Sequence, residues 1–92
     1  MKFASGSTKP SDWKVYNNGA GMFVEVDTSD AGFTSTPRYF TSLDGRTSHW
    51  TLRGMTSIYA ADKDSFRIYI RGETPQKAQA RGWKINWLAV GD

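Results

Sequence analysis

Two groups of residues in this chain have the chemistry of ligand binding, and the first is a histidine beside a tryptophan. His49 and Trp50 are adjacent in a stretch rich in Ser and Thr. An indole face can stack on the apolar face of a sugar ring while an imidazole bonds a hydroxyl, because sugars present C–H patches and hydroxyls on one ring. The alternative is that Trp50 packs in the core and His49 is a solvated turn residue. One His and no Cys argue against a zinc site.

The second group is the polar face of two alternating segments. Residues 66–71 and 82–91 alternate apolar and polar side chains with a period of two, which is typical of half-buried strands. The side chains expected to point outward are Arg67, Tyr69, Arg71, Lys84 and Asn86. An Arg fork and an Asn amide could line an intersubunit cleft and hold hydroxyls or a carboxylate. The alternative is a solvated face or an oligomer interface, with Arg71 and Glu73 as a surface ion pair.

Composition limits the architecture that carries these groups. The 92 residues give room for one modest domain with 4 Trp, 4 Tyr, 5 Phe and no Cys, so buried aromatic faces must stabilise it without disulfides. Small domains of this kind often bury more surface by association, so we expect a homo-oligomer. The formal net charge is +3, and no Lys/Arg run is present, so nucleic acid is not favoured as a partner.

Enzymatic and membrane functions lack sequence signals. No Gly-x-Ser-x-Gly elbow, phosphate loop, Cys nucleophile or His cluster occurs, so the sequence predicts no enzymatic activity and no cofactor. Asp27, Asp30 and Asp44 fall at turns and are not spaced as a calcium loop. No segment approaches the ~18 apolar residues of a membrane span, so no membrane insertion is expected. The N-terminal residues show no apolar signal-peptide core.

The pattern of short segments predicts an all-β fold. Besides the two alternating segments, we expect short strands at residues 13–16, 22–27, 38–43, 50–53 and 56–59, separated by turn residues. Residues 75–81 are expected to be a loop with one helical turn. Residues 1–12 are expected to be an N-terminal extension that packs at an oligomer interface. The whole chain, residues 1–92, is predicted to be a single small antiparallel β-sandwich of about six strands.

Several of these segments together resemble one known family. Asp27-Thr28-Ser29 ends one strand, Gly32-Phe33 and Thr36-Pro37 precede the next, and Ile85-x-Trp87-Leu88-Ala89-Val90-Gly91 closes the chain. Over nearly its whole length the chain resembles the H-type lectin domain, the family of snail agglutinin and the discoidin C-terminal domain. The resemblance implies an H-type-lectin-like sandwich and a homotrimer or hexamer. It also implies binding of galactose or N-acetylgalactosamine between subunits, without calcium.

The resemblance also bears on individual residues. Family members use an aromatic-plus-histidine pair just after the strand that begins here at Phe66, where this chain has Arg71-Gly72-Glu73. They often contribute an acidic residue from the N-terminal loop segment, which here is Asp12. A carboxylate suits that role because it can accept from two adjacent hydroxyls. The alternative is that Asp12 caps a turn beside a core Trp13.

The leading hypothesis is therefore a carbohydrate-binding protein that is multivalent through homo-oligomerisation. The residues expected to bind glycan are His49, Trp50, Arg71, Asp12, Tyr69 and Asn86. A protein of this kind would act outside the cell or at the cell surface. The alternative is a structural trimerisation or adhesion domain with no sugar binding. A third hypothesis is single-stranded nucleic-acid binding by aromatic residues on a basic sheet, for which the net charge is low.

Overall fold

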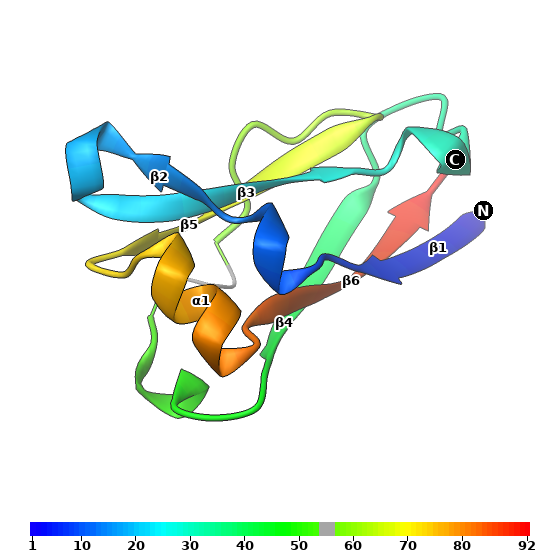
Figure 1. Cartoon of the computed structure of the whole chain (residues 1–92). Helices are drawn as coiled ribbons and strands as arrows, with labels where there is room; N and C mark the ends of the chain where they lie inside the picture. Colours follow the sequence, from blue (N-terminus) through cyan, green and yellow to red (C-terminus); the bar gives the residue numbers. More distant parts are fainter. Residues whose placement is uncertain (54–56) are drawn as a thin grey trace.

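The computed structural model describes residues 1–53 and 57–92, and these residues form two antiparallel sheets and a short helix (Figure 1). One sheet has the strand order β1-β6-β4, with β1 at Lys2–Ser7, β6 at Lys84–Gly91 and β4 at Arg38–Asp44. The other has the order β2-β3-β5, with β2 at Lys14–Tyr16, β3 at Gly21–Asp27 and β5 at Ser65–Arg71. The prediction of a small antiparallel β-sandwich is confirmed.

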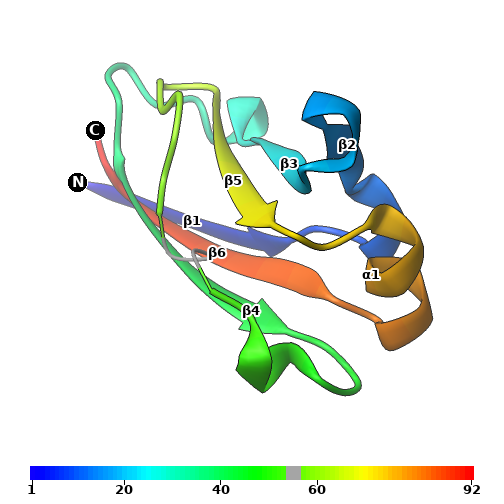
Figure 2. The same ribbon diagram turned by 90° about the vertical axis from the view of Figure 1, so that its left-hand side faces the viewer.

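The core lies between the two sheets, which face each other in Figure 2. Alternate residues of β3, β5 and β6 point inward, as the period of two predicted. Strand β5 contributes Phe66, Ile68 and Ile70, all almost fully buried, and β6 contributes Ile85 and Ala89. Aromatic contacts join the sheets, since the ring of Phe66 lies 4.3 Å from that of Tyr39 on β4 and 6.5 Å from that of Trp87 on β6.

The outward side chains of β5 and β6 do not share one face, so that prediction is wrong. The two strands belong to different sheets, and the chain crosses from one sheet to the other through helix α1, Pro75–Arg81 (Figures 1 and 2). In a sandwich the outer faces of the two sheets point in opposite directions. Arg67, Tyr69 and Arg71 therefore lie on the outside of one sheet, and Lys84 and Asn86 on the outside of the other.

Strand β1 falls within residues 1–12, where the sequence analysis expected only an N-terminal extension. It pairs antiparallel with β6 from Lys2↔Gly91 to Ser7↔Asn86. The glycine at position 6 fits close packing against β6, because a Cβ there would lie 2.8 Å from Nε1 of Trp87. The pairing continues into Thr8, whose buried hydroxyl accepts from the backbone N–H of Ile85 at 2.9 Å. These residues are an integral edge of the sheet.

Helix α1 is longer than the single turn expected in a loop. Both ends of the helix have residues that are typical of helix termini, and these stabilise the helix although it lacks an apolar stripe. The Thr74 hydroxyl accepts from the N–H of Lys77 at 3.2 Å, and Pro75 occupies the first helical turn. Gly82 ends the helix with φ 70°, a left-handed conformation that glycine adopts without strain. The buried side chain of Ala78 fixes the helix to the core.

The connection between β4 and β5 differs from the two strands predicted there. His49–Thr51 forms a 3-10 turn, η4, so the prediction of a strand at residues 50–53 is wrong. The second predicted strand, at residues 56–59, begins outside the described residues. Its last residue, Tyr59, makes an isolated antiparallel bridge to Arg67, with N···O distances of 2.9 and 2.8 Å. Tyr59 therefore extends the β2-β3-β5 sheet beyond β5.

Candidate functional site

The outer face of the β2-β3-β5 sheet carries a cluster of aromatic rings. Tyr69 of β5 lies at its centre, 5.0 Å from the ring of Tyr16 on β2 and 5.3 Å from that of Tyr59. Both neighbours meet Tyr69 edge-on, and Phe23 of β3 stacks against it at 5.5 Å. Edge-on and offset geometries are the favourable ones for aromatic pairs. The rings therefore support each other in place on this outer face.

Strand register explains how residues so far apart in the sequence meet on this face. Directly paired residues of neighbouring antiparallel strands project to the same side of a sheet. Tyr16 pairs with Gly21 of β3, and Gly21 pairs with Arg71 of β5, which makes one row across the sheet. The next row on the same face contains Phe23 and Tyr69. The middle of the first row is bare backbone, because Gly21 has no side chain.

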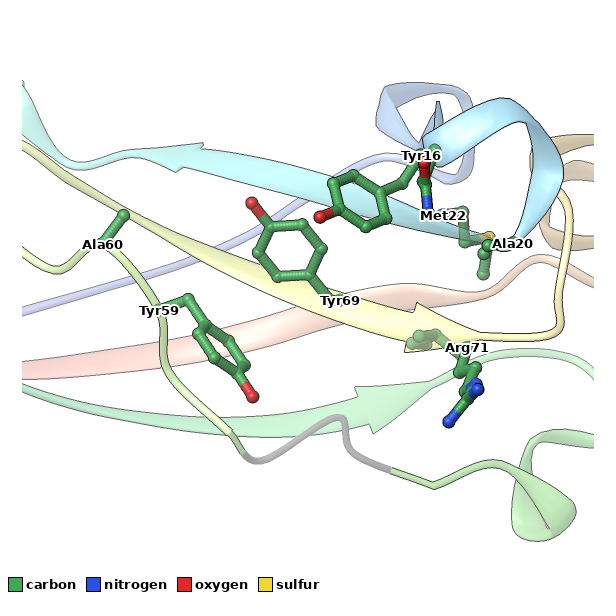
Figure 3. Close-up of a pocket in the computed structure, with 10 residues that line it drawn as sticks. Tyr16, Ala20, Met22, Tyr59, Ala60, Tyr69 and Arg71 are labelled. Atoms are coloured by element: carbon green, nitrogen blue, oxygen red, sulfur yellow. The ribbon is translucent and has the colours of Figure 1, made fainter.

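A cleft of about 610 Å³ opens over this bare position, within the size range of small-ligand sites. We call it the tyrosine cleft, and its principal lining residues are Tyr16, Asn17, Gly21, Tyr59, Tyr69 and Arg71. Figure 3 shows Tyr69 between Tyr16 and Tyr59, with the guanidinium of Arg71 projecting from the same strand. Tyr16 is 47% exposed and Tyr59 is 53% exposed, so both rings offer surface to a ligand.

Arg67 holds the central tyrosine, Tyr69, in place, although it does not itself line the cleft. Its guanidinium donates to Oε1 of Glu25 at 3.1 Å and to the hydroxyl of Tyr69 at 3.3 Å, and it lies 5.4 Å from the ring centre of Phe23. These hydrogen bonds, first to Tyr69 and then to Glu25, raise the pKa of Arg67 above its ordinary value. The Arg67 guanidinium is therefore held by contacts within the protein, and these contacts orient Tyr69 before any ligand binds.

Arg71 is not held by a carboxylate of the described residues in the way that Arg67 is. The surface ion pair with Glu73, given as the alternative for Arg71, is not observed, because Glu73 pairs with Lys77 one helical turn further on, at 3.6 Å. Among the residues that the structure describes, Arg71 has no ion pair, and its side chain is exposed. The tyrosine cleft thus brings together two predicted site residues, Tyr69 and Arg71, with one of them free to bind an external group.

His49 and Trp50 lie elsewhere, in the η4 turn after β4, and neither lines the cleft. Trp50 is 87% exposed, so the alternative that it packs in the core is wrong. His49 is half-buried, and its Nδ1 is buried without a hydrogen-bond partner in the described residues. This pair therefore keeps an exposed indole next to an imidazole, as a separate surface feature.

Asp12 lies in a different hollow, of about 450 Å³, whose lining also includes Glu25, Asp27 and Trp87. Its carboxylate accepts from the backbone N–H of Lys9 at 2.8 Å and closes the 3-10 turn η1, Pro10–Asp12. The turn-capping role given as the alternative for Asp12 is therefore observed. The hollow lies apart from the tyrosine cleft, and the two share no lining residue.

Asn86 is a structural tie on the outside of the β1-β6-β4 sheet. Its Oδ1 accepts from the Ser7 hydroxyl at 2.6 Å, and its Nδ2 donates to Oδ2 of Asp44 at 3.4 Å, so the residue joins all three strands. The backbone N–H of Gly45, followed by the Asn86 amide, lowers the pKa of Asp44. Asn86 thus lies away from Tyr69 and Arg71, on the opposite side of the sandwich.

The sequence analysis did not include Tyr16 and Tyr59 among the site residues. A signal was present for Tyr16, because an aromatic residue alternates there with Val15 in a short strand that ends at a turn. No local signal marks Tyr59, which reaches the cleft only through its bridge to β5.

Two further features of the described residues bear on other functions. Within residues 1–53 and 57–92, no group of three His, Cys, Asp or Glu side chains is placed to hold a metal ion. The described helices are all too short or too polar to cross a membrane.

Comparison of the chain with protein-family models, with curated proteins and with solved structures found no match. The resemblance to the H-type lectin domain therefore stays a prediction from the residues that carry it.

Proposed function

We propose that the chain is a carbohydrate-binding module and that the sugar binds in the tyrosine cleft. The observation that carries the proposal is the group of three mutually supported tyrosines on an open sheet face. Tyr16 and Tyr59 line the cleft with about half of their surface exposed. This exposure distinguishes them from aromatic residues of the core, which are buried. A sugar ring needs an apolar face to stack on and polar groups at its rim, and the cleft supplies both.

The polar groups of the cleft match the hydroxyls of a sugar. The Asn17 amide and the tyrosine hydroxyls both donate and accept, and the Arg71 guanidinium donates. The floor of the tyrosine cleft is the backbone at Gly21, which lets a ligand approach closely because glycine has no side chain. The predicted resemblance adds galactose and N-acetylgalactosamine as the first sugars to test, and we expect binding to persist in a chelator.

A glycan array followed by calorimetry with a soluble hit tests this proposal. Tyr59→Ala removes one wall of the cleft, and we expect affinity to fall by about tenfold, because a lost stacking contact is worth on the order of 1–3 kcal/mol. Trp50→Ala is the control variant, and it also tests the predicted His49–Trp50 pair, since Trp50 is exposed and lies outside the cleft. A loss confined to Trp50→Ala would move the site to η4. Absence of any glycan hit would refute the proposal.

A second candidate function, self-association, is favoured by the other outer face. Phe3 on β1 is 69% exposed and Phe40 on β4 is 55% exposed, and Leu88 and Val90 of β6 lie between them on the same side of the sheet. We call this set the apolar face. The two phenylalanines alone expose roughly 200–300 Å² at 150–250 Å² for a whole aromatic side chain. That area approaches the largest apolar patch of an ordinary monomer.

We propose that a second copy of the chain covers the apolar face. A stable interface buries about 800 Å² on each partner, so the apolar face would form its centre and the flanking polar residues its rim. Association would repeat the tyrosine cleft in one particle and raise avidity for a multivalent glycan.

Light scattering tests the association directly. Phe40→Gln should shift the mass in solution toward the monomer, and Tyr16→Gln on the other sheet should leave it unchanged. A wild-type chain that is monomeric at high concentration would refute association through this face.

A further inference from the structure

We infer that the tyrosine cleft selects acidic sugars, whose carboxylate is bound by Arg71. This inference rests on the proposed function and specifies the ligand class of the same site. It departs from the neutral sugars that the family resemblance implies. The evidence is the different charge environment of two arginines on one strand, Arg67 and Arg71, each two residues from Tyr69 at the centre of the aromatic cluster.

The two arginines on the outer face of β5 have opposite surroundings. Arg67 pairs across the sheet with Glu25, and its guanidinium donates to that carboxylate at 3.1 Å. Arg71 pairs across the sheet with Gly21, which offers no side chain. The register of β3 against β5 thus satisfies one guanidinium inside the protein and leaves the other without a carboxylate.

The loop after β5 does not supply the missing carboxylate either. Glu73 is the nearest acidic residue in the sequence, but its Oε1 lies 3.6 Å from Nζ of Lys77, and its side chain is mostly buried. Of the described residues that line the cleft, Arg71 alone carries a charge, and no acid lines it. A ligand with one negative group would therefore meet one uncompensated cation and no repulsive partner.

The geometry suits a carboxylate on a ring. A guanidinium presents a planar fork of donors that matches a carboxylate with two parallel hydrogen bonds. Arg71 and Tyr16 lie at the two ends of one row, about 10 Å apart by two strand spacings, with only the Gly21 backbone between them. A sugar ring over Gly21 could stack against the tyrosines while its carboxylate reaches Arg71.

Nucleic acid would need a different charge pattern. A strand of DNA or RNA is held by several phosphate contacts, and each contact adds to the salt dependence. The cleft has one uncommitted cation, since Arg67 is held by Glu25 and Tyr69. A single anionic group on a small ring fits this pattern better.

The test compares two oligosaccharides of the same length and linkage that differ only at C6 of each residue, galacturonic acid oligomers and galactose oligomers, by calorimetry at low salt. We expect the wild-type chain to bind the acidic oligomer about tenfold more tightly, as one added charge-assisted contact predicts. Arg71→Gln should abolish that preference, and Arg71→Lys should restore only part of it because the fork is lost. Arg53→Gln is the matched control, since it removes the same charge from an exposed arginine that does not line the cleft.

Each outcome separates the inference from the proposed function. Equal affinity for the two oligomers would overturn the inference and leave the carbohydrate-binding proposal standing. An equal loss in Arg71→Gln and Arg53→Gln would also overturn it, because the effect would then be net charge alone. Tight binding of an oligonucleotide, falling steeply with salt, would replace it with a nucleic-acid site. Absence of binding to both sugars and to the wider array would refute both proposals.

Discussion

The tryptophans of this chain provide a test in which the same substitution should destabilise the fold at one position and leave its stability unchanged at another. Trp83 is fully buried, and its Nε1 donates to the carbonyl of Thr47 at 2.8 Å. Trp50 is exposed, in the η4 turn that follows Thr47 by two residues. We expect Trp83→Phe to destabilise the fold strongly and Trp50→Phe to leave its stability unchanged.

The expected magnitude for Trp83→Phe has two parts. The smaller ring buries roughly 50 Å² less apolar surface, which costs about 1 kcal/mol. The lost N–H also removes the part-buried hydrogen bond to the Thr47 carbonyl, which costs about 0.5–1.5 kcal/mol more because water can reach that carbonyl. The total is about 1.5–2.5 kcal/mol, a large share of the 5–15 kcal/mol expected for a domain. An exposed substitution such as Trp50→Phe should stay within about 0.5 kcal/mol.

Urea denaturation followed by circular dichroism measures both variants without relying on tryptophan emission. With a slope of about 1–2 kcal/mol per molar urea, the midpoint of Trp83→Phe should fall by roughly 0.8–2.5 M. Trp13→Phe is an independent check, since its buried Nε1 donates to the carbonyl of Trp83 at 3.0 Å. Equal midpoints for Trp83→Phe and Trp50→Phe would refute the reasoning, because burial and the Thr47 bond would then contribute nothing.

Two further stability predictions concern a helix cap and a buried phenol. Thr74→Ala removes the cap of α1 and should lower the free energy of unfolding by about 1 kcal/mol, whereas Thr74→Ser should retain most of it in the same urea assay. Burial raises the pKa of Tyr39 above its ordinary value of 10.0. The folded state then holds its proton more tightly than the unfolded state, so stability should fall as the pH rises above 10.0, and an alkaline urea series should show a flatter decline for Tyr39→Phe.

Alternation predicted which side chains of β5 and β6 are buried, but not which sheet each strand joins. A period of two reports one buried face, and that face is the same whether the strands are neighbours or lie in opposite sheets. The separation depends on α1, whose helical caps at Thr74 and Gly82 outweigh its lack of an apolar stripe. The predicted site was therefore divided, with Tyr69 and Arg71 on one side and Asn86 on the other.

The remaining differences come from residues whose conformation is set by distant contacts. Strand β1 has no alternating pattern, because Gly6 must leave space for the Trp87 indole. The η4 turn follows Ser48, which has φ 66°, a value that interrupts a strand. Tyr59 enters the tyrosine cleft through its bridge to Arg67. Such pairings are non-local, and short windows of sequence carry little information about them.

The tyrosine cleft and the apolar face lie on the two opposite outer faces of the sandwich. This arrangement distinguishes two geometries of multivalent binding, with the sugar site within one chain or between subunits. If copies associate through the apolar face, the tyrosine cleft points away from the interface, because the two sheets have opposite outer faces. Each cleft would then be complete within one chain. The family resemblance implies instead that sugars bind between subunits.

The variant Phe40→Gln distinguishes the two geometries when mass and affinity are measured on the same sample. With a cleft complete in one chain, the variant should become monomeric, keep its affinity for a monovalent sugar, and lose only its avidity for a multivalent surface, by about 100-fold or more. With a site between subunits, monovalent affinity should disappear together with the oligomer. The contacts that build the cleft all lie within one chain, through the β2-β3-β5 register and the Tyr59 bridge, so we expect the first result.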